Sequence, residues 1–277
     1  MLQNSLTYLY SNPSGDRFWY DTRPTLRKTV EDRATQQKSE DVDFEIERRL
    51  KTIRKERPFG RLHICPNNSS EVSDDQDIGL VILKCKDAYK ANTPNDLAIQ
   101  AAENILNTRG STPRIYRNML VFVAPDQNTI NVLRQEVRRY LAWLSIRDDK
   151  DILNLDAAQN RETENNLNRS NTQIEAQIRE VFCHLLVPYI DRAVDLKQII
   201  WDSISIRGGD DGILVKTARK MQQNELLVSH WAPTMLQMEL DNLLWREHNE
   251  INVGELWKLL CTCLLYTSDA ADEEDSV

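Results

Sequence analysis

Short apolar runs alternate with helical stripes along the first half of the chain. Three runs, at 62–65, 78–83 and 119–124, are predicted strands, and the last two are continuously apolar, as strands covered on both faces are. Between them, the stretch 95–109 keeps its apolar residues on one side and meets Gly110 at its end, which predicts a helix. A strand, a helix and a strand of this length predict a right-handed parallel crossover.

Two further helices are predicted ahead of these strands. An aromatic run at 17–20 predicts a short strand, and Pro24 then suits the first turn of a helix to about Gln37, with Thr22 as its cap. The stretch 39–57 has an acidic start, an apolar stripe and a basic end, which predict a second helix.

A long helix is predicted after the third run, capped by Asp126 or Asn128. Its apolar seam consists of Ile130, Leu133, Val137, Leu141 and Leu144. The polar stretch 154–178 suits a solvated helical arm, and the helical pattern continues to Pro188. The predicted fold class is therefore α/β, with a small parallel or mixed sheet flanked by helices.

The polar stretch also marks the predicted domain boundary. We expect an α/β domain at 1–150, a helical arm or connector at 151–190, and a mostly helical unit at 191–262. Short helices around a brief β segment near 251–253 make that last unit winged-helix-like. The acidic tail at 263–277 resembles translated sequencing-adapter read-through, and a natural acidic tail is the alternative.

Composition sets broad limits on function. A chain of 277 residues with 40% apolar residues can bury a core, and its net charge of −8 includes five carboxylates in the tail, so the charge does not decide for or against nucleic acid. No stretch approaches the roughly 18 consecutive apolar residues of a membrane span, and no secretory signal opens the chain. The five cysteines lack a disulfide or zinc spacing. We expect a cytoplasmic protein that does not enter a membrane.

Motifs for catalysis are missing from the sequence. No Gly-x-x-x-x-Gly-Lys-Ser/Thr loop occurs among its eight glycines, so we expect no ATP site of that kind in this chain. The four histidines do not fall at metal-ligand spacing, and the cysteines and histidines are too scattered to predict a nucleophile and its base. We therefore predict no catalytic, cofactor-binding or metal-binding residues.

Two groups of arginines are the best candidates for contacts with a partner. Arg114 and Arg117 precede the third apolar run, where they could clamp a phosphate or reach a neighbouring subunit's nucleotide, the alternative being ordinary surface ion pairs. Arg134, Arg138 and Arg139 lie opposite the apolar seam of the long helix, a weaker candidate strip for nucleic-acid phosphates, the alternative being a solvated face.

Several segments in order carry a family resemblance. They are residues 15–34 (GDRFWYDTRPTLRKTVEDRA), 109–118 (RGSTPRIYRN), 121–124 (VFVA), 138–143 (RRYLAW) and 153–156 (LNLD). The set resembles the domain-of-unknown-function 499 family of bacterial and archaeal proteins, large predicted AAA+ ATPases often encoded near methyltransferase and phage-defence genes. The resemblance covers about residues 5–262.

The resemblance implies that the ATP-binding part lies upstream of Met1. The chain would then be the non-catalytic, post-ATPase portion of a parent ATPase, coupling nucleotide state to a partner in a defence or DNA-modification system. ATP and magnesium are expected for the parent and no cofactor for this chain. The expected partners are the N-terminal ATPase core, further copies of the chain, and DNA. A nucleic-acid-binding module is the alternative function.

Overall fold

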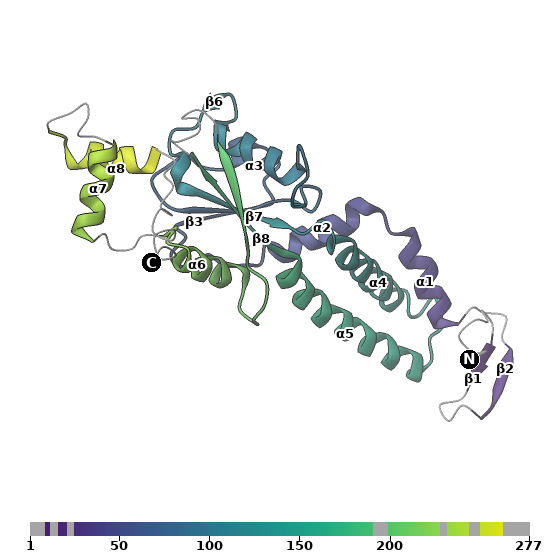
Figure 1. Ribbon diagram of the computed structural model, residues 1–277. Helices are drawn as coiled ribbons and strands as arrows, with labels where there is room; N and C mark the ends of the chain where they lie inside the picture. The colour runs from purple at the N-terminus through teal and green to yellow at the C-terminus, as the bar shows by residue number, and fades with distance from the viewer. Residues whose placement is uncertain are drawn as a thin grey trace. The chain divides into compact units, whose positions relative to one another are not determined.

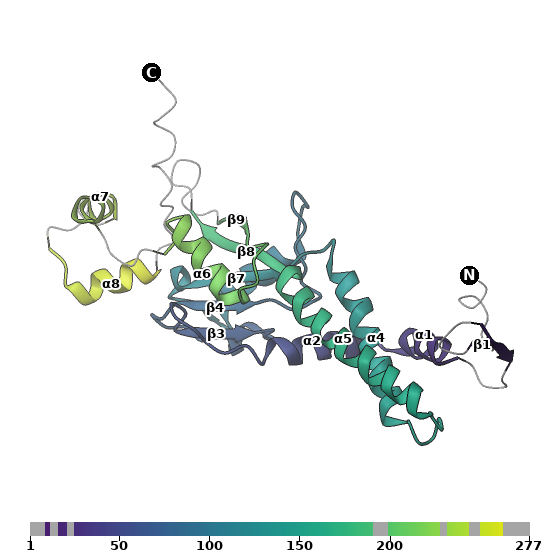
Figure 2. The same cartoon turned by 90° about the horizontal axis from the view of Figure 1, so that it is seen from below.

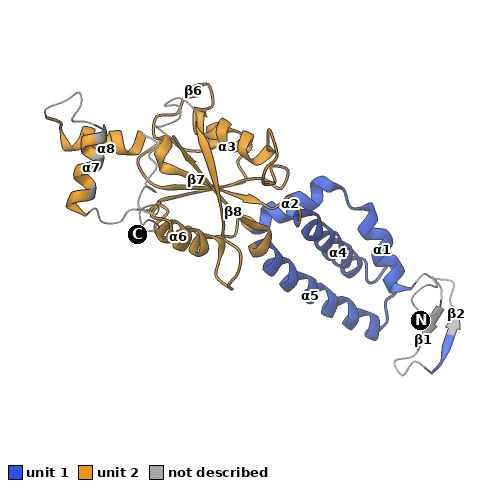
Figure 3. Ribbon diagram, viewed as in Figure 1, with its two compact units in different colours: residues 1–49, 129–178 blue, residues 50–128, 179–277 orange. Residues whose placement is uncertain are grey.

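The chain has an α/β fold, as predicted, in which a mixed sheet is flanked by helices (Figure 1). The computed structural model describes residues 9–11, 16–20, 25–190, 199–227, 232–243 and 250–262. Contacts divide the chain into two compact units, each built from two segments (Figure 3). Unit 1 comprises Met1–Arg49 and Thr129–Ile178, and unit 2 comprises Leu50–Asn128 and Arg179–Val277.

Unit 2 contains a five-stranded sheet with the order β3-β4-β7-β8-β9. Its strands are β3 (Arg61–Ile64), β4 (Gly79–Ile82), β7 (Leu120–Pro125), β8 (Phe182–Tyr189) and β9 (Ile200–Ser205). The first three are parallel, β8 is antiparallel to β7, and β9 is antiparallel to β8. The three predicted apolar runs thus form β3, β4 and β7, and β9 points the same way as β7.

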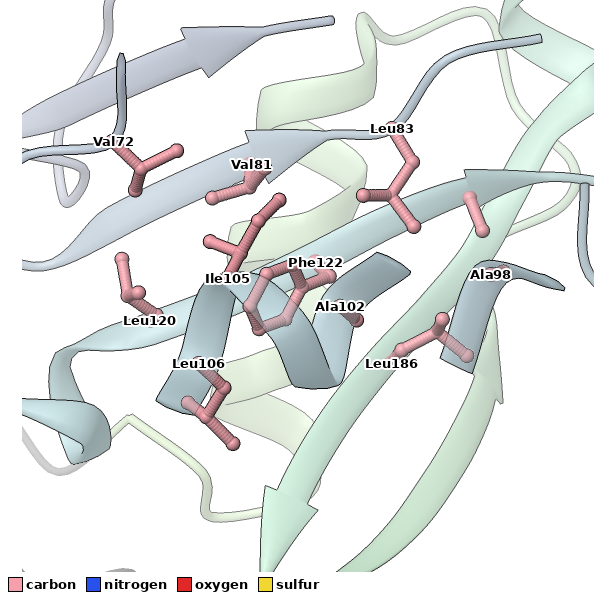
Figure 4. Packing of buried hydrophobic residues seen from close by; sticks show 11 residues of the cluster. Val72, Val81, Leu83, Ala98, Ala102, Ile105, Leu106, Leu120, Phe122 and Leu186 are labelled. Atoms are coloured by element: carbon pink, nitrogen blue, oxygen red, sulfur yellow. The ribbon is translucent and has the colours of Figure 1, made fainter. Parts of the chain in front are cut away.

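Helices cover both faces of this sheet (Figures 1 and 2). On one face α3 (Leu97–Asn107), capped by Asp96, packs on the sheet through a buried apolar cluster (Figure 4). The cluster contains Val72, Val81, Leu83, Ala98, Ala102, Ile105, Leu106, Leu120, Phe122, Ala124 and Leu186. The opposite face is covered by α6 (Ile213–Gln223). This double cover explains why β4 and β7 are apolar at every position.

The predicted helix up to Pro188 is wrong beyond Val181. There α5 (Ala157–Val181) ends and β8 begins. A short apolar run does not distinguish a buried helix from a buried strand by periodicity, and here both neighbouring strands supply the backbone partners. Pro188 fits the strand because its pairing with β7 has ended by Leu186, so its missing N–H leaves no gap there.

Two predicted helix ends are also corrected. The helix predicted over 39–57 is α2 (Ser39–Leu50), which is shorter. The helix before Gly110 stops at Asn107, because β5 (Thr108–Arg109) pairs with β6 (Thr112–Pro113) in a small hairpin. Gly110, at a φ of 62°, lies in the hairpin turn and does not end the helix itself.

Unit 1 is mainly helical. It contains α1 (Leu26–Gln36), α4 (Ile130–Asp148) and most of α2 and α5. Leu26 and Val30 of α1 are buried with Ala142 and Ile146 of α4. The hairpin of β1 (Leu9–Ser11) and β2 (Phe18–Tyr20) confirms the predicted aromatic strand.

The caps of two unit 1 helices differ from the prediction. Thr25 caps α1, since its side chain accepts a hydrogen bond from the Lys28 amide at 3.3 Å, whereas Thr22 and Pro24 lie outside the described residues. The cap of α4 is Thr129, whose side chain makes no capping hydrogen bond to the first turn of the helix, and not Asp126 or Asn128.

The last described helices are α7 (Pro233–Leu243) and α8 (Val253–Thr262). The β segment expected near 251–253 is wrong, because 250–252 are in no strand and α8 starts at Val253. The predicted tail at 263–277 lies outside the described residues. The described helices include none long and apolar enough to cross a membrane.

Candidate functional site

One edge of the sheet collects polar side chains from segments far apart in sequence. The carboxyl ends of β4, β7 and β9 meet there with the amino end of β8. This is the edge at which open α/β sheets commonly bind ligands. Its polar members, called the edge cluster below, are Tyr89, Asp126, Cys183, His184, Ser203 and Arg207. All six belong to unit 2.

Asp126 lies at the centre of the edge cluster, directly after β7. Its side chain is only 3% exposed, and its Oδ2 accepts a hydrogen bond from Arg207 Nη2 at 2.5 Å. Its Oδ1 accepts from the backbone and side-chain nitrogens of Asn128, both at 3.3 Å. The backbone of Asp126 forms a bridge with Tyr89 and donates to Val181 O at 2.8 Å. These bonds fix the carboxylate in place.

His184 lies beside this carboxylate on the face of β8 that carries Leu186. Its Nε2 is 3.6 Å from Asp126 Oδ1, its Nδ1 is 3.4 Å from Ser203 Oγ, and its ring centroid is 4.8 Å from that of Tyr89. Burial lowers the pKa of His184, the nearby Asp126 opposes that shift, and Arg207 adds to it. The imidazole is therefore neutral at pH 7.

Cys183 faces the other side of the sheet, because neighbouring residues of a strand alternate. Its thiol is fully buried, and its Sγ accepts from Arg207 Nε at 3.1 Å. Burial raises the pKa of Cys183, and the Arg207 guanidinium offsets only part of that rise. The thiol is thus protonated at neutral pH and is not an activated nucleophile.

The polar side chains of the edge cluster bond to one another. Arg207 donates to both Asp126 and Cys183, and so joins the ends of β7, β8 and β9. The Ser203 and Asp126 contacts of His184, at 3.4 and 3.6 Å, are longer than good hydrogen bonds, which argues against a serine nucleophile activated by this histidine. The arrangement thus holds the ends of neighbouring strands together.

The sequence does not reveal the edge cluster, because its pattern predicts a helix at His184 and the cysteines and histidines are too scattered to predict a common site. The usable signal was Asp126, an acidic residue directly after a fully apolar strand, at the edge where such sheets bind ligands. Its partners could not be named without the pairing of β7, β8 and β9.

Arg114 is buried and turned inward. Its guanidinium donates to the carbonyl oxygens of Ile105 at 2.7 Å, Ser73 at 2.6 Å and Val72 at 3.0 Å. Burial lowers the pKa of Arg114. Arg117 lies half-buried in the short helical turn η3 (Arg117–Met119), and within the described part of the chain the two arginines share no partner. The donors of Arg114 are thus directed at backbone carbonyls.

The three arginines of α4 also have partners within unit 1. Arg134 holds Asp43 of α2 through two bonds of 2.8 and 2.9 Å, and Arg138 donates to Ser39 Oγ at 3.2 Å. Arg139 is the most exposed of the three and lies 3.5 Å from Glu136 on its own helix. Two of the strip's three members therefore face a neighbouring helix.

The described residues hold no group of three or more His, Cys, Asp or Glu side chains suited to a metal ion. Comparison with protein-family models, with curated proteins and with solved structures finds no match for this chain.

Proposed function

We propose that this chain is a non-catalytic portion of a prokaryotic, cytoplasmic AAA+ ATPase that passes nucleotide state to a partner in a defence or DNA-modification system. The parentage comes from the resemblance to the domain-of-unknown-function 499 family. The observation that carries the non-catalytic role is the closed edge cluster, in which Arg207 is engaged by Asp126 and Cys183. ATP and magnesium belong, in this proposal, to the ATPase core.

The protonation states of the edge cluster support this proposal. A general base or nucleophile works best with a pKa near the working pH and with room for a substrate. Here burial keeps His184 neutral and the Cys183 thiol protonated, while Asp126 is already hydrogen-bonded. Such an arrangement suits a rigid body that transmits motion better than one that performs chemistry.

The inward position of Arg114 supports the same conclusion. An arginine finger needs its guanidinium exposed toward the neighbouring nucleotide. Arg114 donates to three carbonyl oxygens within its own unit, so Arg117 is the better candidate of the pair for a contact between subunits.

Reconstitution with an ATPase core of that family tests the proposal. We expect the full chain to bind the core and to change its rate of ATP hydrolysis, with Arg117→Ala weakening that change and the exposed Arg147→Ala serving as a matched control. Failure to bind the core would contradict the proposal. Salt-sensitive binding of duplex DNA by the chain alone would favour the alternative, a nucleic-acid-binding module.

A further inference from the structure

We propose that Arg207 is an acid-operated latch, which ties the end of β9 to Asp126 while His184 is neutral and releases it when His184 binds a proton. This inference rests on the geometry of the edge cluster and does not depend on the ATPase parentage. It concerns the segment that joins β9 to α6.

A single carboxylate serves two groups in the edge cluster. Asp126 Oδ2 accepts from Arg207, and Asp126 Oδ1 lies 3.6 Å from His184 Nε2. With a neutral imidazole, the one negative charge of Asp126 balances the one positive charge of Arg207. A proton on His184 leaves two positive charges for one carboxylate that is almost excluded from solvent, where such an imbalance costs most.

Of the three charged or titratable side chains, Arg207 is the one that can move away from the edge cluster. Its side chain is 49% exposed, against 3% for Asp126 and 18% for His184, so its charge can return to water with the least rearrangement. The backbone after it is also permissive. Gly208 and Gly209 have φ values of 86° and 73°, and a Cβ added at either would meet nothing within 4 Å.

The groups around His184 determine when the latch opens. Asp126 follows β7, the Tyr89 ring comes from the loop after β4, Ser203 lies on β9, and Arg207 follows β9. Asp96, the cap of α3, is a more distant negative charge. Burial and Arg207 outweigh the two carboxylates and keep the pKa of His184 below its ordinary value near 6.5, so the latch is closed at neutral pH.

Asp96 cannot replace Asp126 as the carboxylate that pairs with Arg207 when the latch opens. Its carboxylate accepts bonds from the backbone amides of Lys90 and Ala98 at 2.8 and 2.9 Å. Opening releases the end of β9 and the start of α6 from Asp126, and it removes the donor that Arg207 provides to Cys183.

Hydrogen exchange of the full chain at pH 7.5 and 5.5, corrected for the intrinsic rate, tests the latch through peptides covering 203–214. We expect exchange there to rise about tenfold at pH 5.5 in the wild type, through local opening. His184→Gln should abolish the rise, and Arg207→Gln should show fast exchange at both pH values.

A matched control is His63→Gln. His63 is a second half-buried histidine whose pKa is lowered by burial, and it lies on β3, away from β9 in the strand order. The His63→Gln variant should leave the effect of pH on exchange at 203–214 unchanged. An unchanged wild-type rate, or an equal pH effect in His184→Gln, would overturn the proposal. If His184→Gln does not fold, a pH-dependent rate in Arg207→Gln would overturn it equally.

Discussion

Asp126 and Arg207 are 81 positions apart in the sequence and form an ion pair at the carboxyl edge of the sheet. Asp126 directly follows β7, and Arg207 follows β9. The pair therefore reaches across β8, which lies between these two strands in the sheet. The same guanidinium also contacts Cys183 at the start of β8. One arginine thus holds three strand ends together.

Breaking this pair should destabilise the chain measurably. Asp126→Asn should lower the free energy of unfolding by about 1–3 kcal/mol, less than for a fully buried pair because half of Arg207 is exposed. Urea denaturation of Asp126→Asn, Arg207→Gln and the double variant would give the coupling energy. Asp211→Asn, which breaks the exposed pair with Arg219, is the control and should cost less than about 1 kcal/mol. Equal losses for both pairs would contradict the latch geometry.

Arg114 should be needed for folding more than for binding. Arg114→Ala leaves three carbonyl oxygens without their donor and should cost about 2–4 kcal/mol of unfolding free energy. Arg117→Ala, three positions along the chain, should change stability by less than about 0.5 kcal/mol. Thermal melts of both variants would measure the difference. A fully stable Arg114→Ala would instead favour the predicted phosphate clamp.

Stability should fall as the solution becomes mildly acidic. His63 and His184 have lowered pKa values in the folded chain, so the unfolded chain binds protons first as the pH drops below the ordinary value near 6.5. The contribution of the two histidines to the free energy of unfolding is present in full above that pH. It is lost as the pH falls toward their pKa values in the folded chain. The urea midpoint should therefore decrease between pH 7.5 and 5.5, and less so in the double variant with both histidines changed to Gln. A midpoint that rises over this range would be inconsistent with neutral, buried imidazoles.

The Cys183 thiol should react slowly with alkylating reagents at pH 7.5. It is fully buried, and its pKa is raised by that burial. Arg207→Gln removes the side chain that contacts it and should speed labelling several-fold, as measured by mass spectrometry of the modified peptide. Cys65, which is also buried but lies after β3, is the internal reference and should label at an unchanged rate. Faster labelling of both cysteines would indicate general unfolding.

The strands at the centre of the sheet could be predicted from sequence because their signal is local. The runs that became β4 and β7 are apolar at every position and are separated by a helix capped at Asp96. The same dependence on local signals explains why the helix predicted over 182–189 is wrong. An apolar run beside a long helix continues its pattern, and only pairing with β7 and β9 makes it a strand.

The edge cluster could not be predicted, since its contacts join distant positions. Asp126 before a helix is a good local cap signal, yet its carboxylate is used by Arg207. Arg114 shows the reverse case: an arginine in a polar loop suggests exposure, while the structure buries it among carbonyl oxygens. In both cases the partner is set by tertiary packing.

Isothermal titration of the purified chain with magnesium-ATP shows whether the chain holds a nucleotide site of its own. We expect no saturable heat and no ATP turnover by the chain alone, because its edge cluster is engaged internally and the sequence contains no phosphate-binding glycine loop. Tight, stoichiometric binding of the nucleotide, or hydrolysis that Asp126→Asn abolishes, would contradict it.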